Sequence, residues 1–170
     1  MLKHRNRLIA AAGAVVTAGA IATAGVMTAA AASHPARVSG TENFQMMTTS
    51  ATSSSDALIA SGVFTVPGVD HENRQNNTSI LVFANGTVSL KHSPGKGTQS
   101  VNPKTCLLTV NFHGTYTLTG GTGAYAGITG SGTYKLSILA IAARSGGKCS
   151  STAPPAAWQQ VIRATGPVNL

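Results

Sequence analysis

The chain has 170 residues, of which 42% are hydrophobic and only 9% are charged, a length that suits one domain. Twelve Lys and Arg stand against four Asp and Glu, which gives a net charge of +8. The basic residues are scattered singly and no aromatic stacking motif accompanies them, so the composition argues against a nucleic-acid partner. Solubility, or a weak attraction to anionic envelope polymers, explains the charge better.

The first 32 residues have the layout of a secretory signal peptide. Lys3, Arg5 and Arg7 form a basic start, and Leu8 to Ala32 carries no charge and ends in small residues. We predict cleavage after Ala32, a secreted product and no stable membrane insertion afterwards. The alternative is an uncleaved anchor, because the apolar run is long enough to span a bilayer core of about 30 Å. Cleavage takes the net charge from +8 to +5, since all four acidic residues remain.

Residues 33–41 are polar, and we expect them to form a flexible leader before a single domain over residues 42–170. That domain contains short runs rich in Val, Ile, Thr, Phe and Tyr, separated by Gly, Pro, Asn and Ser. The spacing predicts an all-β sandwich or barrel. The expected strands lie near 42–50, 57–66, 78–84, 87–92, 105–119, 131–142 and 157–165.

Asn85-Gly86 separates two of these runs and predicts a two-residue hairpin turn, because Asn-Gly tolerates positive φ at both central positions. Such a turn would place three pairs on one face: Phe83 with Val88, Leu81 with Leu90, and Ser79 with His92.

A second hairpin is predicted around a glycine-rich loop, because the word Gly-Thr-Tyr at residues 114–116 returns at residues 132–134. Placing Tyr116 opposite Tyr134 gathers the apolar residues of both arms on one side and the threonines on the other. Even-numbered shifts of the register preserve this separation. We read the glycines between the arms as structural, since the Lys and helix start of a phosphate-binding loop are missing.

Cys106 and Cys149 are the two cysteines, and an exported protein favours a disulfide between them. Cys106 falls opposite Arg144 in the expected register, within a few residues of Cys149. No group of metal ligands at close spacing accompanies the pair, so no metal is expected.

The stretch from Gly114 to Tyr134, above all Gly120-Gly-Thr-Gly-Ala-Tyr-Ala-Gly127, resembles the hairpin of the allene oxide cyclase-like and dirigent-like barrels. Gly62-Val-Phe64 and the Phe83 to Thr87 turn resemble small secreted bacterial members of that group. The resemblance implies an eight-stranded antiparallel β-barrel with an apolar bore, one strand more than the runs counted above. It also implies chemistry without a redox cofactor. Ala124 stands where dirigent-type sequences usually carry a basic residue, and no cyclase active-site residue can be matched.

His92, Tyr116 and Tyr134 are the candidate polar groups of an apolar pocket, because they share faces with apolar residues of the expected strands. Phe83 is a candidate for the pocket wall, and Glu42 for the barrel mouth, where Asp56 is also expected. This assignment leaves almost no charge in the bore. Asp70-His71-Glu72 lies in a polar stretch, where a solvated loop is the simpler interpretation than a cation or acid-base site.

Three functions remain open at this point. The first is binding of a small apolar ligand in the barrel. The second is a cofactor-free cyclase or isomerase that uses His92 and the tyrosines, with Glu42 or Asp56 at the mouth. The third is a basic protein that interacts with the cell envelope.

Overall fold

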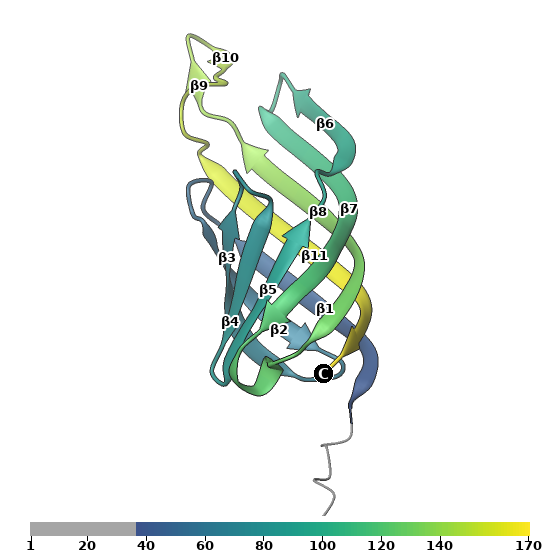
Figure 1. The fold of residues 1–170 in the computed structure, drawn as a ribbon. Helices are drawn as coiled ribbons and strands as arrows, with labels where there is room; N and C mark the ends of the chain where they lie inside the picture. Colours follow the sequence, from purple (N-terminus) through teal and green to yellow (C-terminus); the bar gives the residue numbers. More distant parts are fainter. Residues whose placement is uncertain (1–36) are drawn as a thin grey trace, which may run out of the picture. The chain divides into compact units, whose positions relative to one another are not determined.

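The computed structural model describes residues 37–170, which form a closed eight-stranded antiparallel β-barrel (Figure 1). The expected fold class is therefore confirmed. Around the barrel the order is β5-β4-β3-β2-β1-β11-β8-β7, and β7 pairs with β5 to close the sheet. The eight strands are β1 (Ser39–Thr48), β2 (Ser55–Ser61), β3 (Val66–Asn73), β4 (Thr78–Phe83), β5 (Gly86–His92), β7 (Leu107–Gly121), β8 (Thr129–Ile141) and β11 (Ala157–Asn169).

The proposed signal peptide, residues 1–32, lies outside the described residues. β1 begins at Ser39, so the last three residues of the expected leader belong to the barrel. Val38 and Leu170 exchange two backbone hydrogen bonds, which brings the start of the described chain beside the C-terminus. Within residues 37–170, no helix is long and apolar enough to cross a membrane.

One end of the barrel is filled by aromatic side chains, and we call it the closed end. Tyr125 is 4% exposed and lies on η1, the 3-10 turn Gly123–Tyr125 between β7 and β8. Its ring centroid lies 4.8 Å from that of Phe64 and 5.1 Å from that of Phe83. Phe64 also packs against Phe44, which contacts Tyr116 edge-on. The β7–β8 loop therefore folds back as a plug.

Glycines allow this loop to approach the β4–β5 turn. The Ala124 N–H donates to the Asn85 carbonyl at 2.9 Å, and a Cβ at Gly123, whose φ is +59°, would lie 2.2 Å from that oxygen. A Cβ at Gly86 would lie 2.1 Å from the Thr122 carbonyl oxygen. The structural interpretation of the glycine-rich loop agrees with this packing.

Both hairpins have the expected faces but not the expected registers. In the first, Phe83 pairs with Gly86 and Leu81 with Val88, a shift of two residues from the predicted pairing. The predicted register is wrong because Gly86 is not a central residue of the turn. It is instead the position where the chain packs closely against Thr122. Face assignment survives because side chains alternate with a period of two.

The second hairpin is also shifted by two residues. Tyr116 lies opposite Gly132 and Tyr134 opposite Gly114, instead of tyrosine opposite tyrosine. A Cβ at Gly114 would lie 2.6 Å from the Tyr134 ring, and one at Gly132 would lie 2.8 Å from the Tyr116 ring. Each bulky ring thus covers the glycine across the strand pair, which explains the repeated Gly-Thr-Tyr word.

β3 is the barrel strand that the sequence analysis missed. Its residues, VPGVDHEN, contain Pro67 and Gly68, which weaken a strand prediction, and end in four polar residues that suggested a solvated loop. In the structure, Asp70 pairs with Asp56 of β2 and with Leu81 of β4. The loop interpretation is wrong, because β3 turns Asp70 inward, with an exposed fraction of 2%.

Beyond the opposite end of the barrel, the long strands β7 and β8 continue into an extension (Figure 1). β6 (Lys96–Asn102), which was also not predicted, pairs with the start of β7, and all its residues are exposed. β9 (Arg144–Ser145) and β10 (Lys148–Cys149) form a short hairpin. A disulfide joins Cys106 to Cys149, as expected, and so ties this hairpin to the β6–β7 turn.

Replacing both Cys106 and Cys149 by Ala is expected to lower the free energy of unfolding by about 2–4 kcal/mol, because the cross-link restricts the unfolded chain. Chemical denaturation of the variant and the wild type under non-reducing conditions measures the difference. Since the bond lies in the extension, the barrel is expected to keep its fold and its cavity. Equal stability of the two proteins would show that the extension contributes nothing to global unfolding.

Candidate functional site

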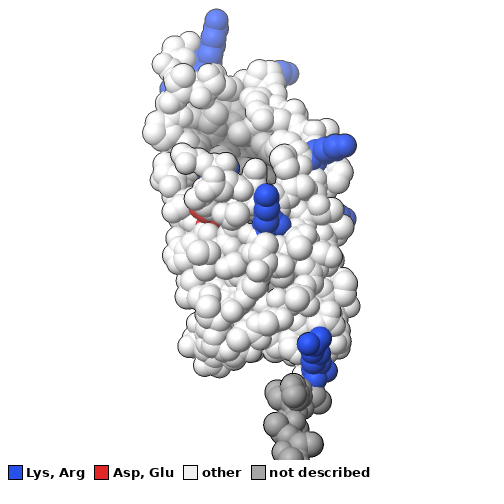
Figure 2. Space-filling view, viewed as in Figure 1, with Lys and Arg blue, Asp and Glu red and all other residues white. Residues whose placement is uncertain are grey.

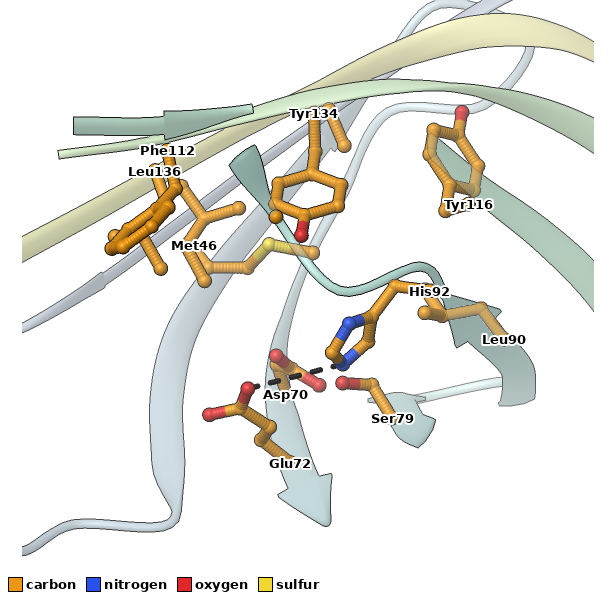
Figure 3. A pocket seen from close by; sticks show the side chains of 13 residues that line it. Met46, Asp70, Glu72, Ser79, Leu90, His92, Phe112, Tyr116, Tyr134 and Leu136 are labelled. Atoms are coloured by element: carbon orange, nitrogen blue, oxygen red, sulfur yellow. Dashed lines mark ion pairs between the residues drawn. The ribbon is translucent and has the colours of Figure 1, made fainter. Parts of the chain in front are cut away.

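The open half of the barrel, between the aromatic plug and the extension, contains a cavity of about 300 Å³ (Figure 3). Strand alternation directs side chains from seven barrel strands into it. The polar cavity residues lie on β3, β4 and β5, and the apolar ones lie mainly on β1, β7, β8 and β11. The lining consists of Met46, Asp70, Glu72, Ser79, Leu90, His92, Gly95, Phe112, Tyr116, Tyr134, Leu136, Ile162 and Ala164.

The apolar wall is formed by Met46, Phe112 and Leu136, which lie together on the side away from the carboxylates in Figure 3. Leu90 and Ile162 also line the cavity. Ala164, which is 6% exposed, contributes only a methyl group and leaves space that a larger side chain would fill. The site can therefore take an apolar body of modest size.

Asp70 is the most deeply buried polar group of the cavity. Burial raises its pKa from 3.8 to about 7, and a hydrogen bond from Ser79 offsets only part of that shift. The negative charges of Asp56 and Glu72 raise it further. Its Oδ1 atom has no hydrogen-bond partner. Near neutral pH this carboxyl group can thus hold or release a proton inside the cavity.

Glu72 and His92 lie beside Asp70 (Figure 3). The His92 Nε2 atom is 3.9 Å from Glu72 Oε1, an ion pair when the imidazole is protonated. The second oxygen, Glu72 Oε2, accepts a hydrogen bond from Arg74 Nε at 2.9 Å. Glu72 is therefore held between a partly buried imidazole and an exposed guanidinium.

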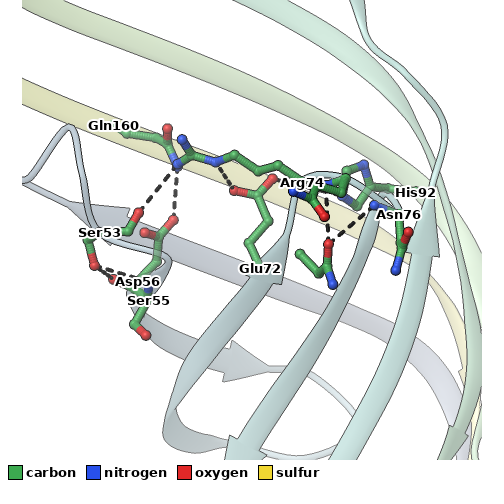
Figure 4. A network of polar contacts seen from close by, with 10 residues as sticks. Ser53, Ser55, Asp56, Glu72, Arg74, Asn76, His92 and Gln160 are labelled. Atoms are coloured by element: carbon green, nitrogen blue, oxygen red, sulfur yellow. Dashed lines mark hydrogen bonds and ion pairs between the residues drawn. The ribbon is translucent and has the colours of Figure 1, made fainter.

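Arg74 lies across the mouth of the cavity and links this group to the β1–β2 loop (Figure 4). Its guanidinium donates to Glu72 and, at 3.4 Å, to the Ser53 carbonyl. Next to it, the 4% exposed Asp56 accepts a hydrogen bond from Gln160 Nε2 at 3.0 Å. Burial raises the pKa of Asp56, and the Gln160 hydrogen bond opposes the shift. Asp56, Asp70 and Glu72 form what we call the carboxylate cluster.

The two tyrosines of the repeated word have different roles in the cavity. The Tyr134 hydroxyl donates to the Ser93 carbonyl at 2.8 Å, and its ring meets His92 edge-on at 5.9 Å. Tyr116 contributes its ring, whereas its hydroxyl points away from the carboxylate cluster in Figure 3 and has no partner. Burial, with a further contribution from the Glu42 charge, raises the pKa of Tyr116 to about 12. Tyr116 therefore contributes its ring to the wall of the cavity and does not act as a proton donor.

The structure brings His92, Tyr116 and Tyr134 together as predicted but separates them from Phe83 and Glu42. Phe83 belongs to the aromatic plug. Glu42 is completely buried near that plug, where its Oε2 accepts the Phe64 N–H at 3.0 Å. Its place at the barrel mouth is therefore corrected to a structural position that holds the β2–β3 loop.

The expectation of an almost uncharged bore is also wrong. All four acidic residues of the protein point into the barrel: Glu42 beside the plug, and the carboxylate cluster in the open half. Asp70 and Glu72 flank the exposed His71, and this alternation could have predicted that both acids point inward. It was missed because β3 was expected to be a loop.

Lys and Arg side chains lie on the outside, and every one that the structure describes is exposed. On the face shown in Figure 2 they stand apart from one another, and very little acidic surface is visible. Within residues 37–170, no three His, Cys, Asp or Glu side chains are grouped so that they could hold a metal ion.

Comparisons with protein-family models, with curated proteins and with solved structures found no significant match to this chain. Its fold and its candidate site are therefore defined by its own geometry.

Proposed function

We propose that this protein binds a small, largely apolar molecule in the open half of its barrel. The observation that carries the proposal is the cavity of about 300 Å³, whose wall is mostly apolar and whose polar groups converge on one side. Small-molecule sites are commonly of this kind, with volumes of about 300–1,000 Å³. The volume stands at the low end of that range, so the ligand is small.

We also propose that the protein is exported and that it belongs to a known group of β-barrels. The disulfide between Cys106 and Cys149 is compatible with an oxidising compartment outside the cytoplasm. With the leader-like first 32 residues, it supports a secreted protein. The resemblance of residues 114–134 to allene oxide cyclase-like and dirigent-like barrels supports membership of that group. Neither proposal depends on a cofactor or a metal.

Ala164→Phe is expected to reduce ligand binding at least about ten-fold, because the new ring occupies space in the cavity and displaces the ligand. The measurement is native mass spectrometry of the wild type and the variant, each purified from its own culture medium. Thr165→Phe is the matched control, since it places the same ring on the outer face of the same strand. Equal ligand occupancy in Ala164→Phe and the wild type would refute binding in this cavity.

A cofactor-free isomerase or cyclase is the second candidate, and the position of Asp70 beside His92 in the cavity favours it. A carboxyl group with a pKa of about 7 beside an imidazole can move a proton on a bound substrate. From the sequence, this role was expected of His92 and the tyrosines, with Glu42 or Asp56 at the mouth, and neither of those two carboxylates lines the cavity. Incubation of the bound ligand with the wild type and with His92→Ala separates the two functions. A ligand recovered unchanged supports binding, and one transformed only by the wild type supports catalysis.

The basic outer surface supports at most a weak attraction to anionic envelope polymers. Scattered exposed charges are screened by salt. Retention on such polymers is therefore expected to disappear as the salt concentration rises, and retention that persists in high salt would contradict a purely electrostatic contact.

A further inference from the structure

The carboxylate cluster gives the cavity an excess of negative charge. Asp56, Asp70 and Glu72 contribute three carboxylates from β2 and β3. Arg74 is the one guanidinium that contacts any of them in the described chain, and its side chain is 54% exposed at the mouth. The charges inside the open half are therefore only partly compensated by the protein.

Asp70 carries this imbalance into the cavity itself. Its side chain lies among the residues that line the space, and its carboxyl group faces the interior beside His92 and Ser79 in Figure 3. The Oδ1 atom of Asp70 has no hydrogen-bond partner, and the residue is buried, with an exposed fraction of only 2%. A buried polar atom without a partner is costly, so a ligand that supplies a hydrogen-bond donor at this position gains affinity.

We propose that the ligand carries a protonated amine, and that this cation pairs with Asp70 while the apolar part of the molecule packs against Met46, Phe112 and Leu136. This inference rests on the proposed binding function and adds the chemical class of the ligand. Tyr134, whose ring meets His92, also lines the cavity, and aromatic faces stabilise cations.

The same geometry disfavours the other charged ligands. A carboxylate ligand would add a negative charge beside Asp70 and Glu72, and this repulsion opposes binding. A metal ion requires several ligands at short distance, and the described residues contain no such group. An ammonium group needs only one carboxylate and a few acceptors, which Asp70, Ser79 and the Glu72 side chain provide.

The charge state of Asp70 makes the pairing depend on pH. The groups that act on it are Ser79 from β4, Asp56 from β2 and Glu72 on its own strand. His92 from β5 and Arg74 at the mouth contact Glu72. The pKa of Asp70 is raised to about 7, so its ionised form increases between pH 6 and pH 8. Affinity for an amine is therefore expected to increase over that range, because the bound cation requires the ionised carboxylate.

Three probes of one shape test the proposal: 1-naphthylmethylamine, 1-naphthalenemethanol and 1-naphthoic acid, titrated into the protein by isothermal calorimetry at pH 8. We expect the amine to bind at least about ten-fold more tightly than the alcohol, because a hydrogen bond between charged groups is stronger than one to a neutral hydroxyl. The acid is expected to bind most weakly. In Asp70→Asn, the preference for the amine over the alcohol is expected to disappear, because the carboxylate that pairs with the cation is absent. Asp56→Asn removes the same charge outside the cavity lining and is expected to retain the preference.

The possible results separate this inference from the proposed function. Equal binding of amine and alcohol by the wild type would overturn the inference and leave the binding function intact. A preference that persists in Asp70→Asn would overturn the role of Asp70. Failure of all three probes to bind would count against both proposals. Titration of the wild type at pH 6 is a second measurement that needs no variant: only the affinity of the amine should fall.

Discussion

The free energy of unfolding of the wild type is expected to fall between pH 4 and pH 8, and in Asp70→Asn most of this decrease is expected to disappear. The pKa of Asp70 is 3.8 in the unfolded chain and about 7 in the folded protein, so the folded state binds the proton more tightly. The stability contributed by the protonated form is present below pH 4 and is lost as the pH rises through 7. The difference in pKa corresponds to about 4 kcal/mol.

The measurement is the free energy of unfolding from denaturant titrations at pH 4, 6 and 8. Burial also raises the pKa of Glu42 and Asp56, so the variant keeps a smaller decrease of the same sign. The two proteins should differ least at pH 4 and most at pH 8, where the variant is more stable. Parallel stability curves would mean that Asp70 ionises normally, and that the cavity is wetter than its geometry indicates.

Tyr125→Ala is expected to lower the free energy of unfolding by about 3–5 kcal/mol, the usual cost of deleting a buried aromatic side chain. Tyr125 is 4% exposed and contacts Phe64 and Phe83 at the centre of the aromatic plug. Its loss leaves a void between the β7–β8 loop and the strands. Thermal and denaturant unfolding measure the effect.

Tyr125→Phe is the matched control, because it keeps the ring and removes only the hydroxyl group. We expect it to cost less than about 1 kcal/mol, the typical net value of one hydrogen bond. A small effect of Tyr125→Ala would show that the loop is not part of the cooperative core. In that case the closed end would be open in solution, and the ligand cavity would continue through the barrel.

Sequence alternation was sufficient to predict the walls of this barrel. The buried Leu81, Phe83 and Val88 and the exposed Ile80 and Val82 occupy the faces that a period of two assigns to them. The register was less accessible, because a shift of two residues leaves every face unchanged. What fixed it was local sterics: a tyrosine ring requires a glycine opposite, and the Asn85 turn must accommodate the β7–β8 loop.

Besides the short β9 and β10, two longer strands escaped prediction, for different physical reasons. β3 contains Pro67 and Gly68, and two of its inward residues, Asp70 and Glu72, are acids instead of aliphatics. β6 is exposed along its whole length, so no buried face constrains its sequence. Hydrophobic alternation is a signal of burial against an apolar core, and neither strand has that environment.

The site was predicted in part for the same reasons. His92, Tyr116 and Tyr134 followed from the faces of strands that were correctly recognised, and all three line the cavity. The carboxylate cluster depends on β3 being a strand, so Asp70 and Glu72 were assigned to solvent. In the structure, the pairing of β3 with β2 and β4 turns them inward.

Binding in the open half of the barrel is most directly tested by NMR spectroscopy of the methionine methyl groups. Met46 is 4% exposed and lines the cavity, whereas its neighbour Met47 is 43% exposed on the outer face of the same strand. On titration with 1-naphthalenemethanol, the Met46 methyl signal is expected to shift and saturate while the Met47 signal stays in place. A shift of Met47 alone, or no shift of Met46 at saturating probe, would contradict a ligand-binding cavity.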